Sequence, residues 1–522
     1  MSERAPFFSV LTRVCDPLVR DLSVAIESVR AQTFRDWELI LVDDGSPSEA
    51  ARALLALAAA SDERITVLEG VAECGIVASS NDALLAAGGQ FLALLDEDDM
   101  LVPHALERVH ATLAESPEAD YVYSDEDLID TDGDRYDEFR KPGWSPERLR
   151  GQMYMGHLSV LRASLVRAVG GFRAGYEGSH DHDLVLRVTE RARRVEHIPE
   201  VLYHWRVVTG PVAADGEAKQ LEWVAGCRAV QDQLDRLGIA GTVTCGRISG
   251  TYQIERVADL GTSVSVIIPT RGGSGMVWGE RRCFVVEAVE SVLARTHLPL
   301  LQIVVVYDLD TPADVLSRLH QMMGDRLVLV PFAEPFNFSA KCNAGFLAST
   351  GDVVVLLNDD IEAITDGFLE QLVAPLSEPG VGMTGARLMF GDGRLQHGGH
   401  LYEDGYRHAF LGASPDDPGP FAALRVNREC SGLTAACVAL RRDTYEEVGG
   451  MCEELPVNFN DVDFSYKVRR KAGRLLWLAD VELYHFESQS RERVVHPREY
   501  DFVTRRWGIP RHDLFLPGTR DT

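Results

Sequence analysis

The sequence predicts an α/β protein of two tandem domains, each built on a mostly parallel, Rossmann-like sheet, with a helix and a hairpin connecting them. Three observations support this fold class. The chain has 522 residues, 45% of them hydrophobic, which is more than one ordinary hydrophobic core accommodates. Short β-branched runs alternate with helical segments, as in βα units. The second half of the sequence also repeats the first.

The composition excludes several classes of protein. The 80 acidic residues outnumber the 52 lysines and arginines, and the formal net charge is −28. A field of that sign repels nucleic acid, so we expect no nucleic-acid partner. Nine scattered cysteines without a CxxC spacing indicate reduced thiols. No apolar run is long enough for a transmembrane helix, and the N-terminus lacks the apolar core of a signal peptide. We therefore expect a cytoplasmic protein, at most peripheral to the inner face of the cytoplasmic membrane.

The elements of the first copy follow from these patterns in chain order. We expect strands near residues 7–12, 38–42, 65–68 and 91–95, and helices near 18–31, 48–60 and 78–87. Parallel strands separated by helices place their carboxyl ends at one edge of the sheet, where ligands bind in such folds. Side chains just after these strands are therefore candidates for a common site.

The internal repeat runs at a nearly constant offset. Residues 81–96, NDALLAAGGQFLALLD, match residues 343–358, NAGFLASTGDVVVLLN, without a gap. Further on, VLYHW at 201–205 matches ELYHF at 482–486. Two copies of one domain explain these matches most simply.

The domain boundaries are expected in the segment between the copies. We place the first domain at 1–210, the connector at 211–260 and the second domain at 261–522. The connector contains helical periodicity over 219–238, and a hairpin follows. Near the start of the second domain, PTRGGSGMVWG lacks the GxGxxG spacing of a phosphate cradle, so we expect a flexible loop there.

Carboxylates crowd the ends of strands in both copies. FLALLDEDDML runs from an apolar strand into Asp96 and Asp98, and VVVLLNDDIEA runs in the same way into Asp359 and Asp360. Neighbouring like charges repel, and each loses hydration on burial. A positive species is therefore expected to neutralise them at both places.

A later Asp and His pair accompanies the carboxylates in each copy. Asp181 precedes His204 by 23 residues, and Asp461 precedes His485 by 24. Oxygen ligands favour Mg²⁺ or Mn²⁺, and one imidazole is compatible with Mn²⁺. We therefore predict a divalent metal cofactor, Mn²⁺ or Mg²⁺.

The motifs ELILVDDGS, LLDEDD, SHDHDLVLR and LYHWR resemble those of inverting family 2 glycosyltransferases of the GT-A fold. These nucleotide-sugar-dependent enzymes build bacterial surface polysaccharides. The second copy resembles the same family, in particular its rhamnosyltransferase-like members, through SVIIPT, LLNDD, FNDVDFSYKV and LYHFESQSR. The resemblance implies two GT-A-type domains, a UDP-, dTDP- or GDP-sugar donor, and an O-antigen or capsule-like glycan acceptor, which includes glycans carried on a lipid.

For the first copy, the resemblance implies that Asp181 is the catalytic base. It would take a proton from the acceptor hydroxyl as that oxygen attacks the anomeric carbon opposite the leaving nucleoside diphosphate, which inverts the configuration. The remaining implied positions are Asp43 and Asp44 for the nucleoside, Asp96 for the ribose, and Asp98 and His204 for the metal.

For the second copy, the resemblance implies that Asp461 is the base and that Asp360 and His485 hold the metal. The nucleotide-sugar positions are Asp308, Asn358, Asp359 and Lys341. This copy departs from the first, because Tyr307 stands in place of Asp43 and Asn358 in place of Asp96.

These assignments have structural alternatives. Asp98 or Asp99 can simply cap the following helix, and VDDGS at 42–46 can be a turn. His204 and His485 can be buried histidines that bond to the backbone, and Lys341 can be a solvated surface charge.

Several functions remain open at this point. The main hypothesis is a bifunctional, metal-dependent glycosyltransferase. The alternative is one catalytic domain with a degenerate second domain that serves as a glycan- or nucleotide-sugar-binding scaffold. A scaffold without turnover is a further class. A nucleotidyltransferase is disfavoured, because its glycine-rich, basic nucleotide loop is missing after the first strand.

Overall fold

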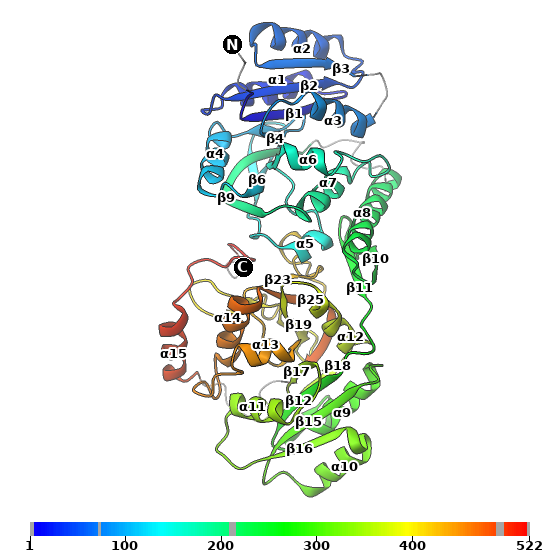
Figure 1. Ribbon diagram of the computed structural model, residues 1–522, viewed down its shortest axis with the longest axis vertical. Helices are drawn as coiled ribbons and strands as arrows, with labels where there is room; N and C mark the ends of the chain where they lie inside the picture. The colour runs from blue at the N-terminus through cyan, green and yellow to red at the C-terminus, as the bar shows by residue number, and fades with distance from the viewer. Residues whose placement is uncertain (1–4, 71–74, 208–215, 487–494, 519–522) are drawn as a thin grey trace. The chain divides into compact units, whose positions relative to one another are not determined.

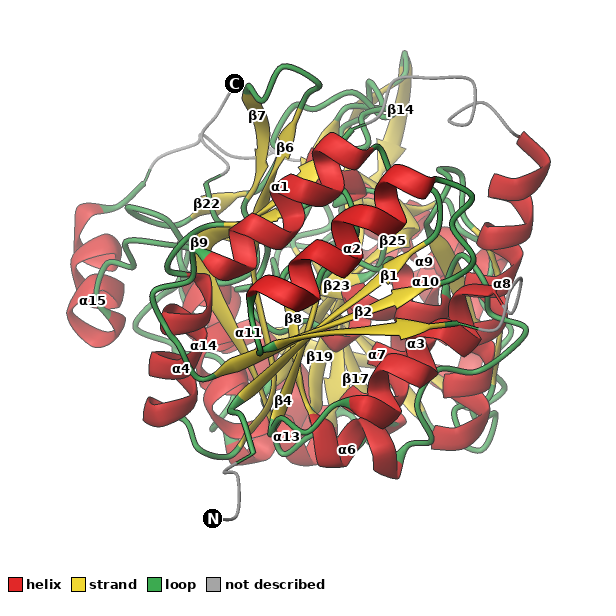
Figure 2. Ribbon diagram, turned by 90° about the horizontal axis from the view of Figure 1, so that it is seen from above, coloured by secondary structure: helices red, strands yellow, loops and turns green. Residues whose placement is uncertain are grey.

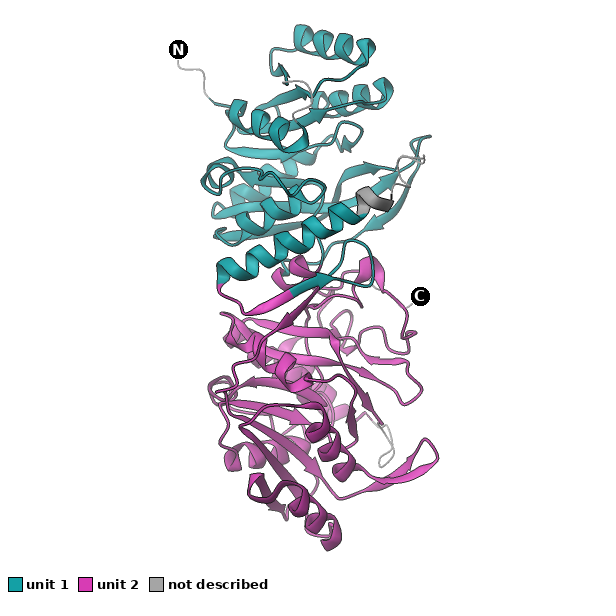
Figure 3. Cartoon of the chain, turned by 90° about the vertical axis from the view of Figure 1, so that its right-hand side faces the viewer, with its two compact units in different colours: residues 1–145, 152–237, 243–252 teal, residues 146–151, 238–242, 253–522 magenta. Residues whose placement is uncertain are grey.

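A computed structural model describes residues 5–70, 75–207, 216–486 and 495–518. The chain forms two compact units (Figure 3). Unit 1 comprises Met1–Ser145, Gln152–Leu237 and Val243–Tyr252, and unit 2 comprises Pro146–Gly151, Gly238–Thr242 and Gln253–Thr522. Each unit consists of one large sheet with helices packed against it (Figure 1).

The first half of the chain alternates strands and helices as predicted. Its elements are β1 (Phe8–Val14), α1 (Val19–Arg30), β2 (Trp37–Asp43), α2 (Glu49–Ser61), β3 (Ile65–Glu69), α3 (Gly75–Ala86), β4 (Phe91–Leu94), β5 (Met100–Leu101), α4 (Ala105–Glu115), β6 (Ala119–Ile129), β7 (Arg135–Phe139), α5 (Pro146–Gly151), β8 (Ser159–Arg162), α6 (Ala163–Ala168), α7 (His180–Thr189) and β9 (Arg194–Arg206). The connecting segment forms α8 (Gly216–Leu237), β10 (Gly241–Cys245) and β11 (Tyr252–Arg256).

The second half repeats this pattern with additional short elements. They are β12 (Val264–Thr270), β13 (Ser274–Val277), β14 (Glu280–Cys283), α9 (Phe284–Arg295), β15 (Leu301–Asp308), α10 (Ala313–Met323), η2 (Gly324–Arg326), β16 (Leu327–Phe332), α11 (Phe338–Ala348), β17 (Val353–Leu357), β18 (Ile361–Ala363), α12 (Phe368–Val373), η3 (Ala374–Ser377), β19 (Val381–Met389), β20 (Leu395–His397), β21 (His400–Leu401), β22 (Arg407–His408), η4 (Pro420–Ala422), β23 (Arg428–Glu429), β24 (Cys437–Arg441), α13 (Arg442–Glu447), α14 (Asn460–Ala472), β25 (Arg474–His485) and α15 (Pro497–Trp507).

The two large sheets have the same strand order. In unit 1 the order is β3-β2-β1-β4-β8-β6-β9-β5, and in unit 2 it is β16-β15-β12-β17-β24-β19-β25-β18. Each position in one list has its repeat-related strand at the same position in the other. The first four strands of each list are parallel, and the following strand is antiparallel. The α/β fold class and the internal repeat are therefore confirmed.

Helices cover both faces of these sheets because the central strands are apolar on both sides. In unit 1, Leu22 of α1 and Leu55 of α2 share one core with Val10 and Leu39, while α3 packs against β1 and β2. Figure 2 shows α1 and α2 side by side along these strands. This arrangement leaves the strand ends, with their acidic residues, outside the two packed layers.

A matched pair of asparagines fixes the same turn in both units. In unit 1, Asn81 donates from Nδ2 to the Phe172 carbonyl oxygen and accepts the Phe172 backbone N–H at Oδ1, both at 2.9 Å. In unit 2, Asn343 makes the same two bonds to Met451, at 3.0 and 2.9 Å. The repeated NxxxL helix and VGG turn are therefore joined by the same contact in each unit.

A buried ion cluster holds α5 in unit 2. Arg256 donates to Glu147 at 2.7 Å and to Glu378 at 2.7 Å, and Arg150 also bonds Glu378 at 2.7 Å. All four side chains are nearly inaccessible to solvent. Two guanidinium groups thus neutralise two carboxylates, which is the condition for burying charge.

One local expectation is replaced by regular structure. In place of the flexible loop expected over PTRGGSGMVWG, residues 269–279, residues 274–283 form the antiparallel hairpin β13–β14, in which Ser274 pairs with Cys283. The hairpin is closed at Trp278–Gly279, where both residues have positive φ, as a two-residue hairpin turn requires. Tertiary contact supports it, since the Trp278 Nε1–H donates to the Gly391 carbonyl oxygen at 2.8 Å.

Candidate active site

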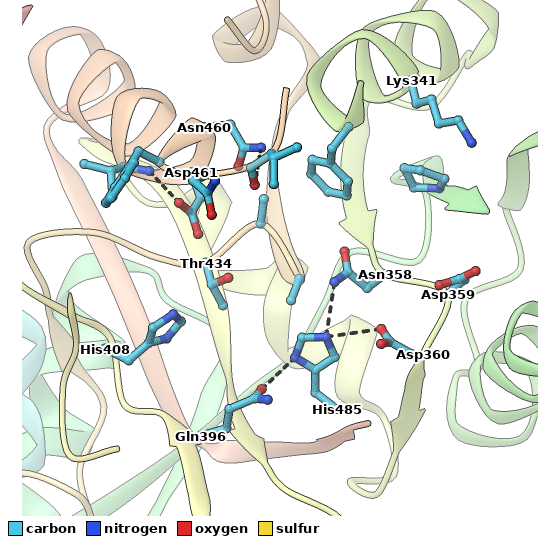
Figure 4. A pocket seen from close by; sticks show the side chains of 18 of the residues that line it. Lys341, Asn358, Asp359, Asp360, Gln396, His408, Thr434, Asn460, Asp461 and His485 are labelled. Atoms are coloured by element: carbon cyan, nitrogen blue, oxygen red, sulfur yellow. Dashed lines mark hydrogen bonds and ion pairs between the residues drawn. The ribbon is translucent and has the colours of Figure 1, made fainter. Parts of the chain in front are cut away.

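A cavity of about 520 Å³ lies at the carboxyl ends of the unit 2 strands (Figure 4). It gathers residues from β12, α11, the segment that follows β17, α14 and β25. Six of the residues singled out in the second copy line it: Lys341, Asn358, Asp359, Asp360, Asp461 and His485. The seventh, Asp308, contacts the lining residue Lys341 at 2.5 Å.

His485 ends β25 and connects three polar side chains in this pocket. Its Nδ1 lies 2.6 Å from Gln396 Oε1, and because an amide oxygen only accepts, Nδ1 carries the proton of the neutral ring. The lone pair of Nε2 then faces Asp360 Oδ1 at 3.1 Å and the amide of Asn358 at 3.2 Å. Two electron-pair donors in such proximity suit a shared cation, and a histidine bonded through its other nitrogen is the usual form of a metal ligand.

Asp360 and Asp359 stand in opposite electrostatic environments. Burial raises the pKa of Asp360, but without a bound cation a protonated His485 donates to this carboxylate, and its hydrogen bond and charge outweigh burial and leave the pKa below its ordinary value. Burial and the charge of Asp360 raise the pKa of Asp359. Asp359 accepts a hydrogen bond from the Thr270 hydroxyl at 2.6 Å. The pair therefore holds less than two full negative charges unless a cation is bound.

Lys341 is buried, not a solvated surface charge. Its side chain is 1% exposed, and Nζ donates to the Thr270 carbonyl oxygen at 2.8 Å and pairs with Asp308 at 2.5 Å. The ammonium group thus stands beside the strand ends of β12 and β15. It supplies a fixed positive charge next to Asp308 at the base of the pocket.

Asp461 lies in the first turn of α14, and its repeat partner Asp181 lies in the first turn of α7. Each carboxylate accepts the next residue's backbone N–H at 2.8 Å, from Val462 and His182 respectively. Burial raises the pKa of Asp461. The shared geometry shows that the two aspartates are equivalent in the repeat.

Several pocket residues were not found from the sequence. Gln396, His400 and His408 line the cavity, and they come from the segment between β19 and β24. That segment has no similar stretch in the first copy, so comparing the copies gave no signal for it. A cluster of histidines in LQHGGHLYEDGYRH was the only available indication.

Unit 1 brings a different histidine to its acidic cluster. Asp96 and Asp99 lie within metal-ligand reach of His157, whose Nε2 is 3.4 Å from Asp96 Oδ2. Burial lowers the pKa of His157, but Asp96 and Glu126 raise it well above its ordinary value. By strand pairing, His157 corresponds to Ala436 of unit 2, so a cationic ring stands where the other pocket has a methyl group.

The pairing of β5 also changes the correspondence between the acidic clusters. Met100 pairs with His204, whereas Ile361 pairs with His485. The repeat partner of Asp360 in the sheet is therefore Asp99, although the ungapped sequence offset gives Asp98. Asp99 is fully buried and accepts the Tyr203 hydroxyl at 2.6 Å and the Arg206 backbone N–H at 2.7 Å. Neither Asp98 nor Asp99 caps α4, whose N-cap is His104.

His204 is buried and bonded to a carboxylate. Its Nδ1 pairs with Asp127, and its Nε2 is buried with no hydrogen-bond partner among the described residues. Asp127 thus does for His204 what Gln396 does for His485. The alternative of a histidine bonded only to backbone does not describe either residue.

Asp43 and Asp44 follow β2 and differ in what they contact. Asp43 accepts the Ser46 backbone N–H at 2.8 Å, so it stabilises the turn that VDDGS suggested. Asp44 pairs with Arg13 of β1 at 2.9 Å. In unit 2 the equivalent Asp308 pairs with Lys341 of α11, so both units place a cation beside this carboxylate but draw it from different elements.

The structure also describes the membrane-spanning potential of the helices and the state of the cysteines. Among the described residues, no helix is long and apolar enough to cross a membrane. The eight described cysteines are free thiols, and Cys74 lies outside the described residues.

Comparison with known proteins gives a family match in both halves. The model described as Glycosyl transferase family 2 matches residues 20–169 and 265–449. An uncharacterized protein, y4gI of Sinorhizobium fredii, is 38% identical over 99% of this chain and 57% of its own length. The O-antigen biosynthesis protein RfbC of Myxococcus xanthus is 32% identical over 98% of this chain and 40% of its own length. The chain therefore spans about half the length of these curated relatives.

A solved structure is also similar in part. The crystal structure of S. aureus TarS 1–349 in complex with UDP-GlcNAc covers 44% of this chain and 72% of that chain, with 16% identity and a TM-score of 0.35.

Proposed function

The chain belongs to glycosyl transferase family 2, and we propose that it transfers sugars from UDP-, dTDP- or GDP-sugar donors to a growing surface glycan such as O-antigen or capsule. The observation that carries this proposal is the unit 2 cavity, in which Asp461, Asp360 and His485 line one space. The similarity to RfbC supports the choice of acceptor. We place the reaction in the cytoplasm or at the inner face of the cytoplasmic membrane, and the acceptor includes glycans on a lipid carrier.

The donor set of unit 2 fits a divalent metal, Mn²⁺ or Mg²⁺. Asp360 and His485 would hold the ion, and Gln396 orients His485 through its Nδ1–H. When bound, such an ion neutralises the charge that develops on the leaving nucleoside diphosphate. Asn358 Oδ1 is buried without a hydrogen-bond partner in the described part of the chain, which leaves one further oxygen available to a ligand.

The chain's own residues account for the remaining chemistry. The carboxylate of Asp461 accepts the proton of the acceptor hydroxyl while that oxygen forms a bond to the anomeric carbon. The bond from that carbon to the diphosphate oxygen breaks on the opposite side, and the configuration inverts. Asp308, Asp359 and Lys341 form the wall against which the nucleotide sugar is bound, with Thr270 linking Asp359 to this wall.

Unit 1 is proposed to be a second transferase with Asp181 as its base. Asp98 and His204 are its candidate metal positions, Asp96 is its candidate ribose position, and Asp43 and Asp44 are its candidate nucleoside positions. A specific observation favours a second candidate function for this unit. Because His157 pairs with Asp96, unit 1 can bind a nucleotide sugar or glycan without turning it over, while unit 2 catalyses.

The experiment compares Asp461→Asn and Asp181→Asn in the full chain. Each variant is incubated with a panel of nucleotide sugars and Mn²⁺, and donor consumption and product linkage are followed. Loss of one linkage in each variant supports two transferases. Loss only in Asp461→Asn supports one catalytic unit and a binding unit. If neither variant slows any transfer, the assignment of both bases is wrong.

A further inference from the structure

Three histidine rings gather beside Asp461 in unit 2. His400 of β21 pairs with His408 of β22 across two short antiparallel strands. Their ring centroids are 5.2 Å apart, and His397 lies 5.1 and 4.9 Å from them. His400 Nε2 is 3.6 Å from Asp461 Oδ2. Figure 4 shows His408, Thr434 and Asp461 in one part of the pocket and the His485–Asp360 pair in another.

The hydrogen bonds of His397 fix the tautomers of both His397 and His408. The Thr434 backbone N–H donates to His397 Nε2 at 3.2 Å, so the proton of neutral His397 is on Nδ1. That Nδ1 is 2.8 Å from Nδ1 of His408, which therefore accepts. The proton of neutral His408 is then on Nε2. Burial lowers the pKa of His397 well below its ordinary value, which keeps that ring neutral.

Tyr402 fixes the tautomer of His400 in the same way. The Tyr402 hydroxyl lies 3.3 Å from His400 Nδ1. Burial raises the pKa of Tyr402 well above its ordinary value, so the hydroxyl keeps its proton and donates it. Burial lowers the pKa of His400 to about 3, so the ring is neutral near pH 7. Its remaining proton is on Nε2, the nitrogen that faces Asp461.

We propose that His400 is a positioning residue that presents its Nε2–H to the carboxylate of Asp461 and keeps that carboxylate ionised and aimed at the acceptor hydroxyl. The inference rests on the proposed role of Asp461 as the base. The 3.6 Å contact is longer than a hydrogen bond, and such contacts in ligand-free sites often shorten when the substrate binds.

The physical need for this donor is burial of the base. Burial raises the pKa of Asp461, and the hydrogen bonds from the Thr434 side chain and the Val462 backbone N–H, together with any positive charge on His408, lower it. A neutral carboxylic acid cannot accept the acceptor's proton, whereas N–H donors favour the charged carboxylate. The polar groups that face Asp461 come from several elements: His400 of β21, Tyr402 after it, His408 of β22, Thr434 before β24, and the Val462 backbone N–H of α14.

The same three histidines have ring nitrogens within 4.8 Å of one another, which also permits a metal ion. The hydrogen bonds argue against it. A ligand nitrogen must be free of its proton, yet His397 Nε2 already accepts from Thr434, so coordination through Nδ1 would leave the ring without any proton. These histidines therefore act as hydrogen-bonding groups and not as metal ligands.

The test measures the pH dependence of kcat/KM for transfer by the full chain. His400→Leu removes the N–H donor, and His400→Gln keeps a donor near the position of Nε2. A base acts only when deprotonated, so a higher pKa moves the acidic fall in kcat/KM to higher pH. His400→Leu is expected to move the fall up by about one pH unit, the size of one hydrogen bond to a charged group. His400→Gln is expected to restore it.

Other outcomes would overturn the inference. If His400→Leu lowers kcat without moving the acidic fall, or behaves like His400→Gln, His400 has a structural role only. Asp461→Asn separates the two proposals. If this variant leaves transfer intact, the proposed function fails. If it abolishes transfer while the histidine variants leave the pH profile of kcat/KM unmoved, only the inference fails.

A second measurement, made on the wild-type protein, tests the inference even if the variants do not fold. ¹⁵N NMR of wild-type protein labelled at histidine reports which ring nitrogen carries each proton. We expect Nδ1–H for His397 and Nε2–H for His400 and His408. The opposite tautomer at His400, or a zinc ion bound by the wild type and lost in His397→Leu, contradicts the inference.

Discussion

Replacing Gln396 by leucine should weaken manganese binding in unit 2 by about 10- to 100-fold. Gln396 is 3% exposed and accepts the His485 Nδ1–H at 2.6 Å. Leucine is similar in size but has no acceptor, so it leaves that N–H buried and unsatisfied at a cost of about 1–3 kcal/mol. About 1.4 kcal/mol corresponds to a tenfold change in affinity. The cost of the unsatisfied N–H therefore agrees with the expected loss of manganese affinity.

A matched variant separates lost hydrogen bonding from lost packing. Gln396→Glu keeps an acceptor at the same position and strengthens it with a negative charge. Unit 1 already uses a carboxylate in this way, because Asp127 pairs with His204 Nδ1. We therefore expect Gln396→Glu to bind manganese at least as tightly as the wild type. Gln253→Leu, a substitution at a half-buried residue that removes a bond to Asp480, serves as the control distant from the pocket.

The assay is titration of the full chain with Mn²⁺, followed by electron paramagnetic resonance of the free ion. His485→Ala identifies which binding step belongs to unit 2, since unit 1 has its own acidic cluster. The reasoning is refuted if His485→Ala removes no binding step, or if Gln396→Leu binds manganese as tightly as the wild type.

Three further predictions concern stability. Arg256→Met removes one of the two guanidinium groups that Glu147 and Glu378 share. It should lower the free energy of unfolding, measured in urea, by about 3–5 kcal/mol, and an unchanged midpoint would contradict a charged cluster. Burial raises the pKa of Glu147, but Arg256 outweighs it and leaves the pKa below its ordinary value of 4.5, so this stabilisation is present above pH 4.5 and is lost as the pH falls below it. Glu147→Gln should lack that part of the acid dependence, and a parallel pH profile would count against the assignment. Asn343→Ala removes both bonds to Met451 and should cost about 1–3 kcal/mol, measured as a shift of the thermal midpoint.

The sequence predicted the architecture because the relevant signals are local and repeated. Strand–helix alternation placed β1, β2, β3 and β4 within about two residues of their observed bounds. The constant offset between the copies predicted two domains, and the identical strand orders confirm the repeat. Residues at strand ends were also predictable as neighbours, since parallel strands bring their carboxyl ends together.

The sequence was less informative about which carboxylates of the two copies occupy equivalent positions. An ungapped offset matches Asp360 with Asp98, but the pairing of Met100 with His204 shifts the match to Asp99. Register is decided by hydrogen bonding between strands far apart in the chain, and a one-residue shift turns every side chain to the other face. That information is not contained in either segment alone.

The sequence by itself determined the repeat, the α/β class and the residue types available for chemistry, because periodicity and composition are properties of neighbouring residues. Only the tertiary structure decided which of those residues meet. It buried Lys341 against Asp308, joined Gln396 to His485, and placed His400 beside Asp461 from a segment that has no counterpart in the first copy. The physical reason is that a side chain's charge and tautomer depend on its partners in space, and those partners lie some 30 to 90 positions away along the chain.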